Sequence, residues 1–472
     1  MALFSRVLVA NRGEIACRVI RACHKLGLQA VAVYSEADAG ALHTELADDR
    51  ISIGQAAARE SYLRAERLIE AALRSGAQAV HPGYGFLAES PCFAQAVRDA
   101  GLIWVGPEPR TIADMGDKQR ARDIALQAGV PVLPGSRAFR AEEPVDALHA
   151  AATEVGYPLL VKAAAGGGGI GMRLVTSADE LPGVVSATQS LCKRSFGDGA
   201  VYFERFIASA RHVEVQVFGD GKGRAVHLFE RDCSIQRRYQ KVVEESPVPN
   251  LPDTLRLALT EAAVRLAEIQ RYAGPGTVEF LVDAAGGRFY FLEMNTRVQV
   301  EHCVTEMVTG LDIVAMQLAL ANGESSMPAQ DGIRVRGHAI ECRVCAEDPK
   351  AGLRPSTGRL SRFDLGPPSD DVRIETGYRA GDVVSMYYDS LLAKIIVWAP
   401  DRASAVRRMA EALDHARVEQ VATNLSLLRA ILTHPSFAAA EVDTRFLEQH
   451  AMQLGLTPAA KPAHVPARLP AA

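Results

Sequence analysis

The first hundred residues alternate between short apolar runs and stretches in which apolar side chains recur at helical spacing. Residues 7–10 form an apolar run typical of a strand, and the apolar side chains within 14–26 lie on one face of a helix. The alternation continues, with strands expected at 30–34, 79–81 and 102–105 and helices at 62–73 and 93–100. Strands that alternate with helices in this way predict a doubly wound α/β domain with a parallel sheet, which we assign to residues 1–114.

The pattern changes after the prolines that follow this first domain. We expect residues 115–133 to be a linker. Residues 134–206 are expected to form a compact unit, in which the strands 159–162 and 172–175 flank a glycine-rich segment.

The remaining residues predict an α+β portion. Period-two alternation dominates residues 207–450, and helical spacing returns at 254–268 and 403–416. The Ala- and Pro-rich residues 451–472 are typical of a tail or a linker. We therefore expect a multidomain protein that is α/β in its N-terminal domain and α+β afterwards.

Composition and charge narrow the class of protein. The 472 residues carry a net charge of −4 and 48% of them are hydrophobic, which is ordinary for a soluble globular protein and gives no sign of a nucleic-acid partner. No apolar run approaches the roughly 20 residues of a membrane helix, and the N-terminus lacks a signal-peptide pattern. The eight scattered cysteines suggest reduced thiols, so we expect a cytoplasmic protein with no membrane partner.

A glycine-rich segment stands between the two strands of the compact unit. Four consecutive glycines, 166–169, and then Gly171 follow the strand that ends at Lys162. Glycine permits close backbone approach and exposes N–H groups that can cradle phosphate, and Lys162 could add charge. The segment lacks the ending of a Walker A loop and opens no helix, and the alternative is a flexible hairpin tip.

Two carboxylates are expected to face each other across a hairpin. In an antiparallel pairing around the turn at Gly287, Glu279 falls nearly opposite Glu293, with Cβ atoms about 5 Å apart. Two carboxylates that close repel each other unless a cation lies between them, and Mg²⁺ prefers such oxygen ligands. The alternative is a pair of solvated charges at a sheet edge.

The residues after Glu293 place polar groups at alternate positions. If the chain stays extended, one face carries a carboxylate, an amide, a guanidinium, a second amide and a potential base, namely Glu293, Asn295, Arg297, Gln299 and Glu301. A second segment, 230–241, is dense in basic residues that could hold phosphate and a small anion. A solvated face is the alternative in both places.

Together these motifs resemble those of biotin carboxylases of the ATP-grasp superfamily. The resemblance rests on Gly-Gly-Gly-Gly-Ile-Gly-Met (166–172), Glu-Arg-Asp-Cys-Ser-Ile-Gln-Arg-Arg-Tyr-Gln-Lys (230–241), Glu-Met-Asn-Thr-Arg-Val-Gln-Val-Glu-His (293–302), Ala-Asn-Arg-Gly-Glu-Ile (10–15), His-Pro-Gly-Tyr-Gly-Phe (81–86), Met-Gly-Asp-Lys (115–118) and Glu-Cys-Arg (341–343). It covers roughly residues 5 to 450. It implies an ATP-grasp fold after the N-terminal domain, with 134–206 as a lid domain that carries a mobile glycine-rich lid.

The resemblance also implies a reaction. ATP would phosphorylate bicarbonate to carboxyphosphate, which delivers CO₂ to N1 of biotin, with Mg²⁺ (or Mn²⁺) as the metal. The residues implied for ATP are Lys118, Lys162, Gly168, Gly169, Glu204, Arg205, Phe206, Ile207, His212, Gln236, Tyr239 and Leu281, and those for the metal are Glu279, Glu293 and Asn295. Bicarbonate would be fixed by Lys241, Arg297, Gln299 and the backbone of Val300. Glu301 would be the general base, and Arg343 would stabilise the enolate of biotin.

Two positions depart from the family's pattern. Ile170 stands where a basic residue is frequent, and Tyr239 stands where many members have His. Both departures bear on nucleotide affinity, and Ile170→Arg is expected to lower the KM for ATP.

The implied partners are those of a multicomponent carboxylase. Residues 375–385 and 388–394 look like acyl-CoA carboxylase α subunits, and the absence of Met-Lys-Met implies that biotin is carried by a separate carrier protein or domain. A carboxyltransferase subunit is expected as a further partner, and a homodimer is possible. The alternatives are an ATP-grasp ligase for another carboxylate and a non-catalytic nucleotide-binding regulatory subunit.

Overall fold

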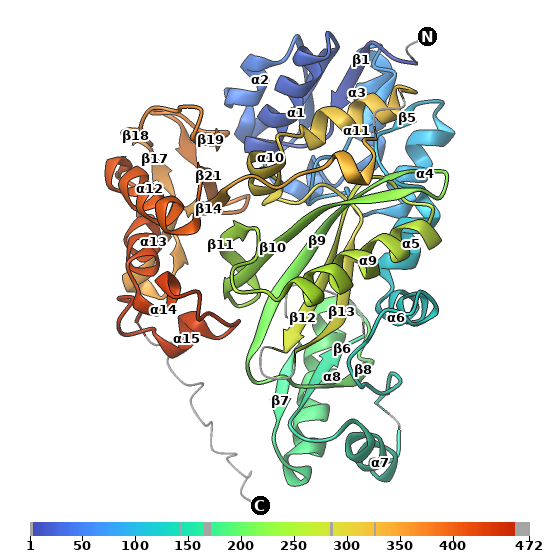
Figure 1. Ribbon diagram of the computed structural model, residues 1–472. Coiled ribbons are helices and arrows are strands. Elements are labelled where there is room, and N and C mark those ends of the chain that lie inside the picture. The colour runs from blue at the N-terminus through green and yellow to red at the C-terminus, as the bar shows by residue number, and fades with distance from the viewer. Residues whose placement is uncertain (1–2, 142, 165–170, 284–286, 325–326, 458–472) are drawn as a thin grey trace, which may run out of the picture.

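The N-terminal domain is a five-stranded parallel sheet in the order β3-β2-β1-β4-β5 (Figure 1). The computed structural model describes residues 3–457 except 142, 165–170, 284–286 and 325–326. The domain's elements are β1 (Arg6–Val9), α1 (Gly13–Lys25), β2 (Gln29–Ser35), α2 (Leu42–Leu46), β3 (Asp49–Gly54), α3 (Ala65–Arg74), β4 (Ala79–His81), α4 (Pro91–Asp99), β5 (Ile103–Trp104) and α5 (Pro109–Gly116).

Both faces of this sheet are covered, which confirms the doubly wound architecture. Val7 and Val9 pack into a core with α1 and with the later helix α11 (Ile313–Ala321), whereas Leu8 packs on the opposite face with α3 and α4. The three apolar side chains of β1 are therefore buried on alternating faces, as expected of a central parallel strand, while Arg6 at its start is only partly buried. The sequence pattern missed β3, which is a largely exposed edge strand and has no continuous apolar run.

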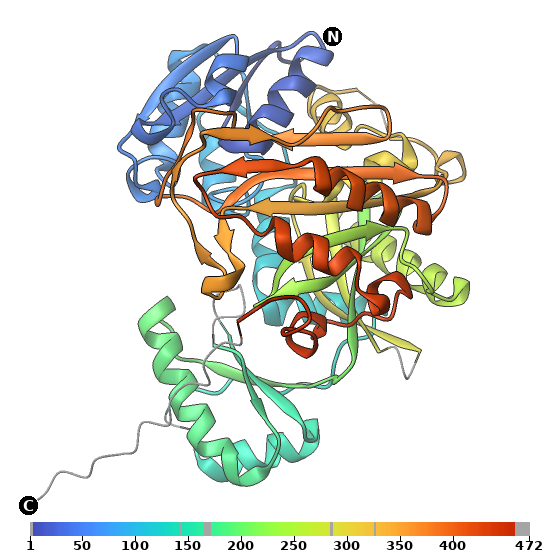
Figure 2. The same cartoon turned by 90° about the vertical axis from the view of Figure 1, so that its left-hand side faces the viewer.

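A small unit follows, and Figure 2 shows it projecting from the rest of the molecule. Its antiparallel sheet has the order β7-β6-β8 and is covered by two helices. Its elements are α7 (Val145–Val155), β6 (Leu159–Ala163), β7 (Arg173–Val175), α8 (Leu181–Phe196) and β8 (Val201–Arg205). Residues 165–170, which include Gly168, Gly169 and Ile170, lie outside the described residues.

The segment 115–133 differs from the expected linker because it contains a packed helix, α6 (Lys118–Gln127). Ala121 and Ala125 of α6 are buried in the same core as strands of the large sheet described next. The charged side chains between them left only a narrow apolar stripe in the sequence, which the strand and helix patterns did not register.

The largest sheet has eight antiparallel strands in the order β13-β12-β9-β10-β11-β14-β21-β19. These strands and the helices among them are β9 (Ala210–Asp220), β10 (Ala225–Arg237), β11 (Gln240–Ser246), α9 (Asp253–Ile269), β12 (Ala273–Asp283), β13 (Arg288–Asn295), α10 (His302–Thr309), β14 (His338–Cys345), β19 (Val372–Thr376) and β21 (Leu391–Ala399). The C-terminal part adds β15 (Glu347–Asp348), β16 (Arg354–Pro355), β17 (Gly358–Arg359), β18 (Arg362–Asp364), β20 (Val383–Val384), α12 (Arg402–His415), β22 (Arg417–Glu419), α13 (Leu425–Leu432), α14 (Pro435–Ala438) and α15 (Phe446–Gln449).

The register of the large sheet brings the expected polar residues together. Glu279 of β12 pairs with Glu293 of β13, and Thr277 pairs with Asn295. The expectation that the chain stays extended to Glu301 is wrong, because β13 ends at Asn295 and a turn leads into α10. The side chains after Asn295 therefore converge from a turn and not from one strand face.

Among the described residues, no single helix has the length and apolar character needed to cross a membrane. The pair α10 and α11 passes that test together by length and composition only, with a bend of 96° between them. Most side chains of both helices are buried in the protein.

Candidate active site

A cavity of about 540 Å³ lies between the projecting unit, the β12–β13 hairpin and strand β14. Within the described residues, every side chain expected to bind ATP, metal, bicarbonate or biotin lines this cavity except Glu301. Glu301 is fully buried behind its wall and contacts two residues that line it, Lys241 and Arg343. Of the residues that the sequence predicted for the site, Lys118 and Arg343 lie farthest apart in the chain, and the fold brings both to this cavity.

One end of the cavity is built from the projecting unit. Lys162 of β6 lies beside Glu204 of β8, with 2.7 Å between Nζ and Oε1. Burial alone would lower the pKa of Lys162, but the Glu204 carboxylate raises it above its ordinary value. Burial and the charge of Lys162 lower the pKa of Lys118. Two ammonium groups facing one cavity suit a polyanion such as a triphosphate.

The backbone that leaves β8 contributes the neighbouring wall, where Arg205, Phe206 and Ile207 line the cavity beside Leu281 of β12. Gln236 near the end of β10 and Tyr239 in the turn between β10 and β11 also line the cavity. Tyr239 is about half exposed and has a positive φ of 67°.

The centre of the cavity holds several carboxylates and few cations. Lys241 donates to Glu279 at 2.8 Å and to Glu301 at 2.5 Å, and it also contacts Glu214. His212 Nε2 lies 3.0 Å from Glu279 Oε2. Burial opposes ionisation of Glu279, but Lys241 and His212 together lower its pKa well below the ordinary value.

Glu293 faces this group from the opposite strand. It makes no hydrogen bond or ion pair with any residue that the structure describes, and desolvation and the charge of Glu279 raise its pKa. The side chain of Asn295 donates to Glu279 at 3.0 Å. Two carboxylates and an amide with oxygen atoms at one place fit the ligand preference of Mg²⁺.

The turn after β13 forms a corner of the cavity lined by a guanidinium group and an amide group. Arg297 donates to Gln299 Oε1 at 2.8 Å, and Gln299 donates to Glu279 at 3.1 Å. Arg297 is oriented by Glu89, a loop residue of the N-terminal domain, through a 2.8 Å ion pair.

Glu301 lies between two cations. Lys241 Nζ is 2.5 Å from one carboxylate oxygen and Arg343 Nη2 is 2.9 Å from the other. Burial would raise the pKa of Glu301, but Lys241 and Arg343 lower it well below the ordinary value. Arg343 also pairs with Glu244, whose pKa is raised to about 7 by burial.

Several residues of the site were missed by the sequence analysis. Glu214 and Arg231 form a fully buried ion pair of 2.6 Å beneath Lys241. The alternation of β9, which puts Glu214 on the same side as His212, is a signal that could have found Glu214. Two further residues reach the site from the N-terminal domain. Tyr84 belongs to the motif 81–86, which the sequence analysis gave no role in the site, and no sequence pattern points to Glu89.

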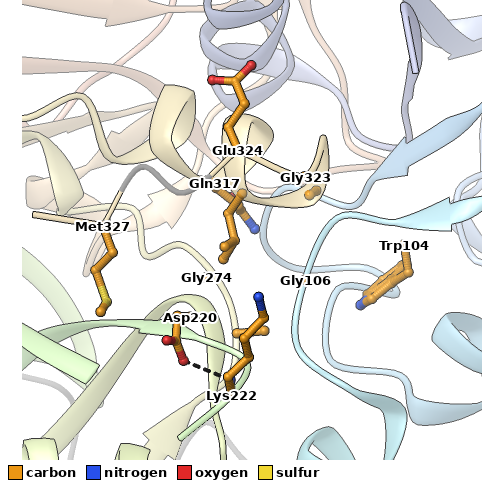
Figure 3. A pocket seen from close by; sticks show the side chains of 12 residues that line it. Trp104, Gly106, Asp220, Lys222, Gly274, Gln317, Gly323, Glu324 and Met327 are labelled. Atoms are coloured by element: carbon orange, nitrogen blue, oxygen red, sulfur yellow. Dashed lines mark hydrogen bonds between the residues drawn. The ribbon is translucent and has the colours of Figure 1, made fainter. Parts of the chain in front are cut away.

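A second cavity of about 330 Å³ lies where the N-terminal domain meets the large sheet (Figure 3). Trp104 lines it from the N-terminal domain, Lys222 from the β9–β10 turn and Gln317 from α11. None of the residues expected for nucleotide, metal or bicarbonate lines this second cavity.

Comparison with known proteins agrees with the geometry. Residues 3–112 match the family description "Biotin carboxylase, N-terminal domain", residues 117–327 match "Carbamoyl-phosphate synthase L chain, ATP binding domain", and residues 341–449 match "Biotin carboxylase C-terminal domain". A biotin carboxylase of Nostoc sp. is 46% identical over 446 residues, which are 94% of this chain and 99% of that protein. The chain belongs to the biotin carboxylase family. It is accordingly an ATP-dependent ligase that forms a C–N bond, and the resemblance drawn from its motifs is confirmed.

Longer relatives and solved structures extend this family assignment. Methylcrotonoyl-CoA carboxylase subunit alpha of Dictyostelium discoideum is 46% identical over 94% of this chain, which spans only 63% of that relative's length. The biotin carboxylase of Campylobacter jejuni superposes with a TM-score of 0.91 at 42% identity, covering 95% of this chain and 99% of that one. The biotin carboxylase domain of Hydrogenobacter thermophilus 2-oxoglutarate carboxylase, solved as a dimer with MgADP and bicarbonate, also gives 0.91, at 43% identity and 96% and 99% coverage. The fold class expected from the sequence is therefore confirmed.

Proposed function

We propose that this chain uses MgATP and bicarbonate to carboxylate biotin on a carrier protein or domain, through carboxyphosphate. The observation that carries the proposal is that one cavity is lined by two lysines suited to phosphate and by a carboxylate pair suited to Mg²⁺, with the proposed base Glu301 directly behind its wall between two cations. We assign the lid domain to 134–206 and the core to 207–450.

The nucleotide occupies the end of the cavity beneath the projecting unit. Lys118 and Lys162 attract the phosphates, while the backbone of 204–207 and the side chain of Leu281 hold the adenine. His212, Gln236 and Tyr239 contact the ribose side. Closure of the projecting unit over this end excludes water from carboxyphosphate, which hydrolyses readily.

Glu279, Glu293 and Asn295 hold Mg²⁺, which when bound neutralises phosphate charge and orients the transferred phosphoryl group. The carboxylate of Glu293 fits this role, because it makes no hydrogen bond or ion pair with a described residue and feels Lys118 and His212 only at longer range. Asn295 keeps its amide nitrogen on Glu279, which leaves its oxygen for the metal and for Arg297.

Bicarbonate binds at Lys241, Arg297, Gln299 and the backbone of Val300, where Glu301 deprotonates it. In the free protein Lys241 and Arg343 keep Glu301 ionised, and so low a pKa makes it a weak proton acceptor. Bicarbonate competes for these cations, which raises the pKa of Glu301 once the substrate is present. Arg343 then stabilises the negative charge on the oxygen of deprotonated biotin.

The proposed partners follow from the family. The biotin carrier and the carboxyltransferase lie on other proteins or domains, and the acceptor is an acyl-CoA, as the names of the longer relatives suggest. A homodimer is proposed because a dimer is named for a similar structure. The proposed compartment is the cytoplasm, since all eight cysteines are free thiols.

The test is ADP release from MgATP, measured with and without bicarbonate and free biotin. We expect ADP release to require bicarbonate, to rise with biotin and to fall at least about 100-fold in Glu301→Gln. The matched control is Glu70→Gln, since Glu70 is exposed on α3 and its ion pair is with Arg74 of the same helix.

The two rivals predict other results. ADP release that depends on a different carboxylic acid would identify another ATP-grasp ligase. MgATP binding without any turnover would identify a regulatory subunit.

A further inference from the structure

Two consecutive peptide groups beside the bicarbonate corner are held by buried side chains. His302 Nδ1 lies 2.7 Å from the carbonyl oxygen of Gln299, and Lys394 Nζ lies 2.6 Å from the carbonyl oxygen of Val300. A peptide group is planar, with its C=O and N–H pointing in opposite directions. The contact to the Gln299 carbonyl therefore sets the direction of the Val300 N–H.

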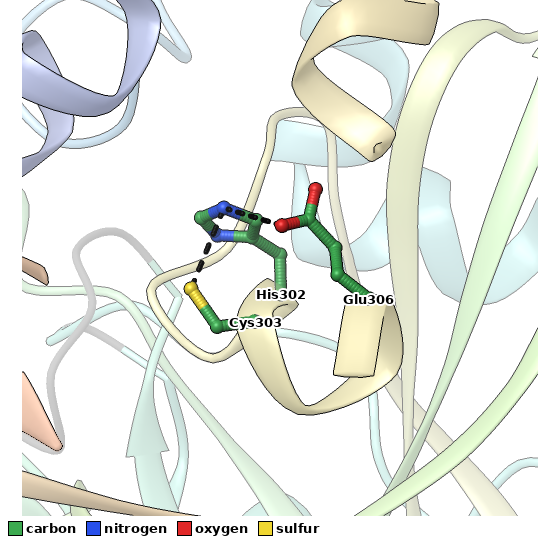
Figure 4. A group of neighbouring side chains, drawn as sticks. All are labelled: His302, Cys303 and Glu306. Atoms are coloured by element: carbon green, nitrogen blue, oxygen red, sulfur yellow. Dashed lines mark hydrogen bonds and ion pairs between the residues drawn. The ribbon is translucent and has the colours of Figure 1, made fainter. Parts of the chain in front are cut away.

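The protonation of His302 follows from its surroundings. Its side chain is fully buried, and burial lowers its pKa to about 4, so the ring is neutral near pH 7. A carbonyl oxygen only accepts hydrogen bonds, so the single proton is on Nδ1. Nε2 then carries a lone pair and faces Cys303 Sγ at 3.7 Å (Figure 4).

The third member of the group in Figure 4, Glu306, is engaged elsewhere. It lies 4.0 Å from His302 Nε2, and its two oxygens pair with Arg18 at 2.9 Å and Arg373 at 2.7 Å. Two guanidinium groups already balance its charge. We therefore interpret His302, Cys303 and Glu306 as a structural group that fixes the turn and not as a metal site.

Lys394 reaches the same turn from the large sheet. It pairs across strands with Arg343, so the two cations are neighbours on one sheet face. Arg343 contacts the side chain of Glu301, while Lys394 contacts the backbone just before it. Lys394 is fully buried, 3.4 Å from Cys303 Sγ and 3.2 Å from Glu14 of α1.

From this arrangement we infer that His302 and Lys394 are positioning residues that orient the peptides on both sides of Val300 toward bicarbonate. The inference rests on the proposed function, in which bicarbonate binds at Val300. Neither side chain lines the cavity, so both act through the backbone. Glu14 connects this arrangement to the N-terminal domain.

The test compares two amide substitutions of His302 in the full chain. Asn can place its side-chain N–H where Nδ1 lies, whereas the longer Gln places it near Nε2. We expect His302→Asn to keep the KM for bicarbonate within about twofold of the original protein, and His302→Gln to raise it at least about tenfold. The KM for ATP should stay within about twofold in both variants.

Three outcomes decide the inference. A folded His302→Gln with an unchanged KM for bicarbonate would overturn it, as would equal changes in both KM values, which indicate a general structural defect. If the original protein shows no bicarbonate-dependent turnover, the proposed function fails instead.

Lys394→Gln tests the second peptide independently of the folding of His302→Gln. It removes the charge and keeps a donor, and a rise of at least about threefold in the KM for bicarbonate with an unchanged KM for ATP supports the inference. An unchanged KM for bicarbonate in a folded Lys394→Gln contradicts it.

Discussion

Arg343 would serve two steps of the proposed reaction. In the free protein it donates to Glu244 and to Glu301, so its charge is shared between two buried carboxylates. Its planar, forked guanidinium can pass from Glu301 to an incoming oxyanion without losing its contact with Glu244. In the proposed reaction, Arg343 would therefore act on biotin after Glu301 has acted on bicarbonate.

Replacement of Arg343 should separate these two steps. We expect Arg343→Gln to lower the biotin-dependent rate at least about 100-fold, because a charge-stabilising donor is lost, and to leave bicarbonate-dependent ADP release without biotin within about fivefold. Both rates are read from ADP release with and without free biotin. Arg343→Lys is the matched control, since it keeps the charge and loses the fork. Equal loss of both rates would assign Arg343 to bicarbonate alone.

For individual residues, the sequence predicted the side chains that the structure brings together at one cavity, but it did not predict most of the residues that hold them in place. Glu301 and Lys241 belong to contiguous motifs of charged residues, which are visible in a linear pattern. Glu89 and Glu14 reach the site from the N-terminal domain, and only folding brings them within contact distance. Glu89 lies in no recognised motif, and Glu14 lies in one (10–15) whose contact with Lys394 only the fold reveals.

The β12–β13 hairpin is the element that carries the proposed metal site. Strand alternation and the glycine turn predicted that Glu279 would lie opposite Glu293, and the register confirms it. The same alternation wrongly predicted an extended chain after Asn295, because the polar residues that follow lie in a turn and at the start of α10. Period-two patterning cannot distinguish a strand from a turn whose side chains happen to converge.

The facing carboxylates of this hairpin should lower the thermal stability of the protein in the absence of metal. We expect Glu293→Gln to unfold at the same or a slightly higher temperature than the original protein without nucleotide, since like charges directly opposite destabilise a sheet by about 0.2–1 kcal/mol. The variant should lose the rise in melting temperature that MgADP gives. ADP with EDTA is the control, and a wild-type response of Glu293→Gln to MgADP would remove Glu293 from the metal site.

The molecule as a whole is joined by buried charges as well as by apolar cores. Glu306 of α10 forms ion pairs with Arg18 of the N-terminal domain and with Arg373 of β19, so one carboxylate contacts two distant parts of the chain. The parallel sheet was predictable from its alternating elements, but α6 and these ion pairs were not, because they depend on how the parts meet. Burial alone would raise the pKa of Glu306, but Arg18 and Arg373 help to lower it to about 2.

This depressed pKa predicts how stability depends on pH. A carboxyl group whose pKa is lower in the folded state than in the unfolded chain stabilises the protein above about pH 4.3, the pKa of an unperturbed Glu. This stabilisation is lost as the pH falls toward the pKa of the group in the folded state. We expect Glu306→Gln to lower the free energy of unfolding by about 3 kcal/mol at pH 7, from a shift of roughly two pKa units. The difference from the original protein should shrink as urea unfolding is repeated from pH 5 toward pH 2.

The matched control is Glu45→Gln, since Glu45 also joins the N-terminal domain to the C-terminal part, through Arg379, but is exposed. Solvent screens an exposed pair, so this variant should show a much smaller difference at every pH. A difference for Glu306→Gln that stays constant from pH 7 to pH 2 would show that lost packing, and not the ionised carboxylate, accounts for the destabilisation. A difference that closes with falling pH would show that the N-terminal domain is held to the large sheet by a charge that must stay ionised.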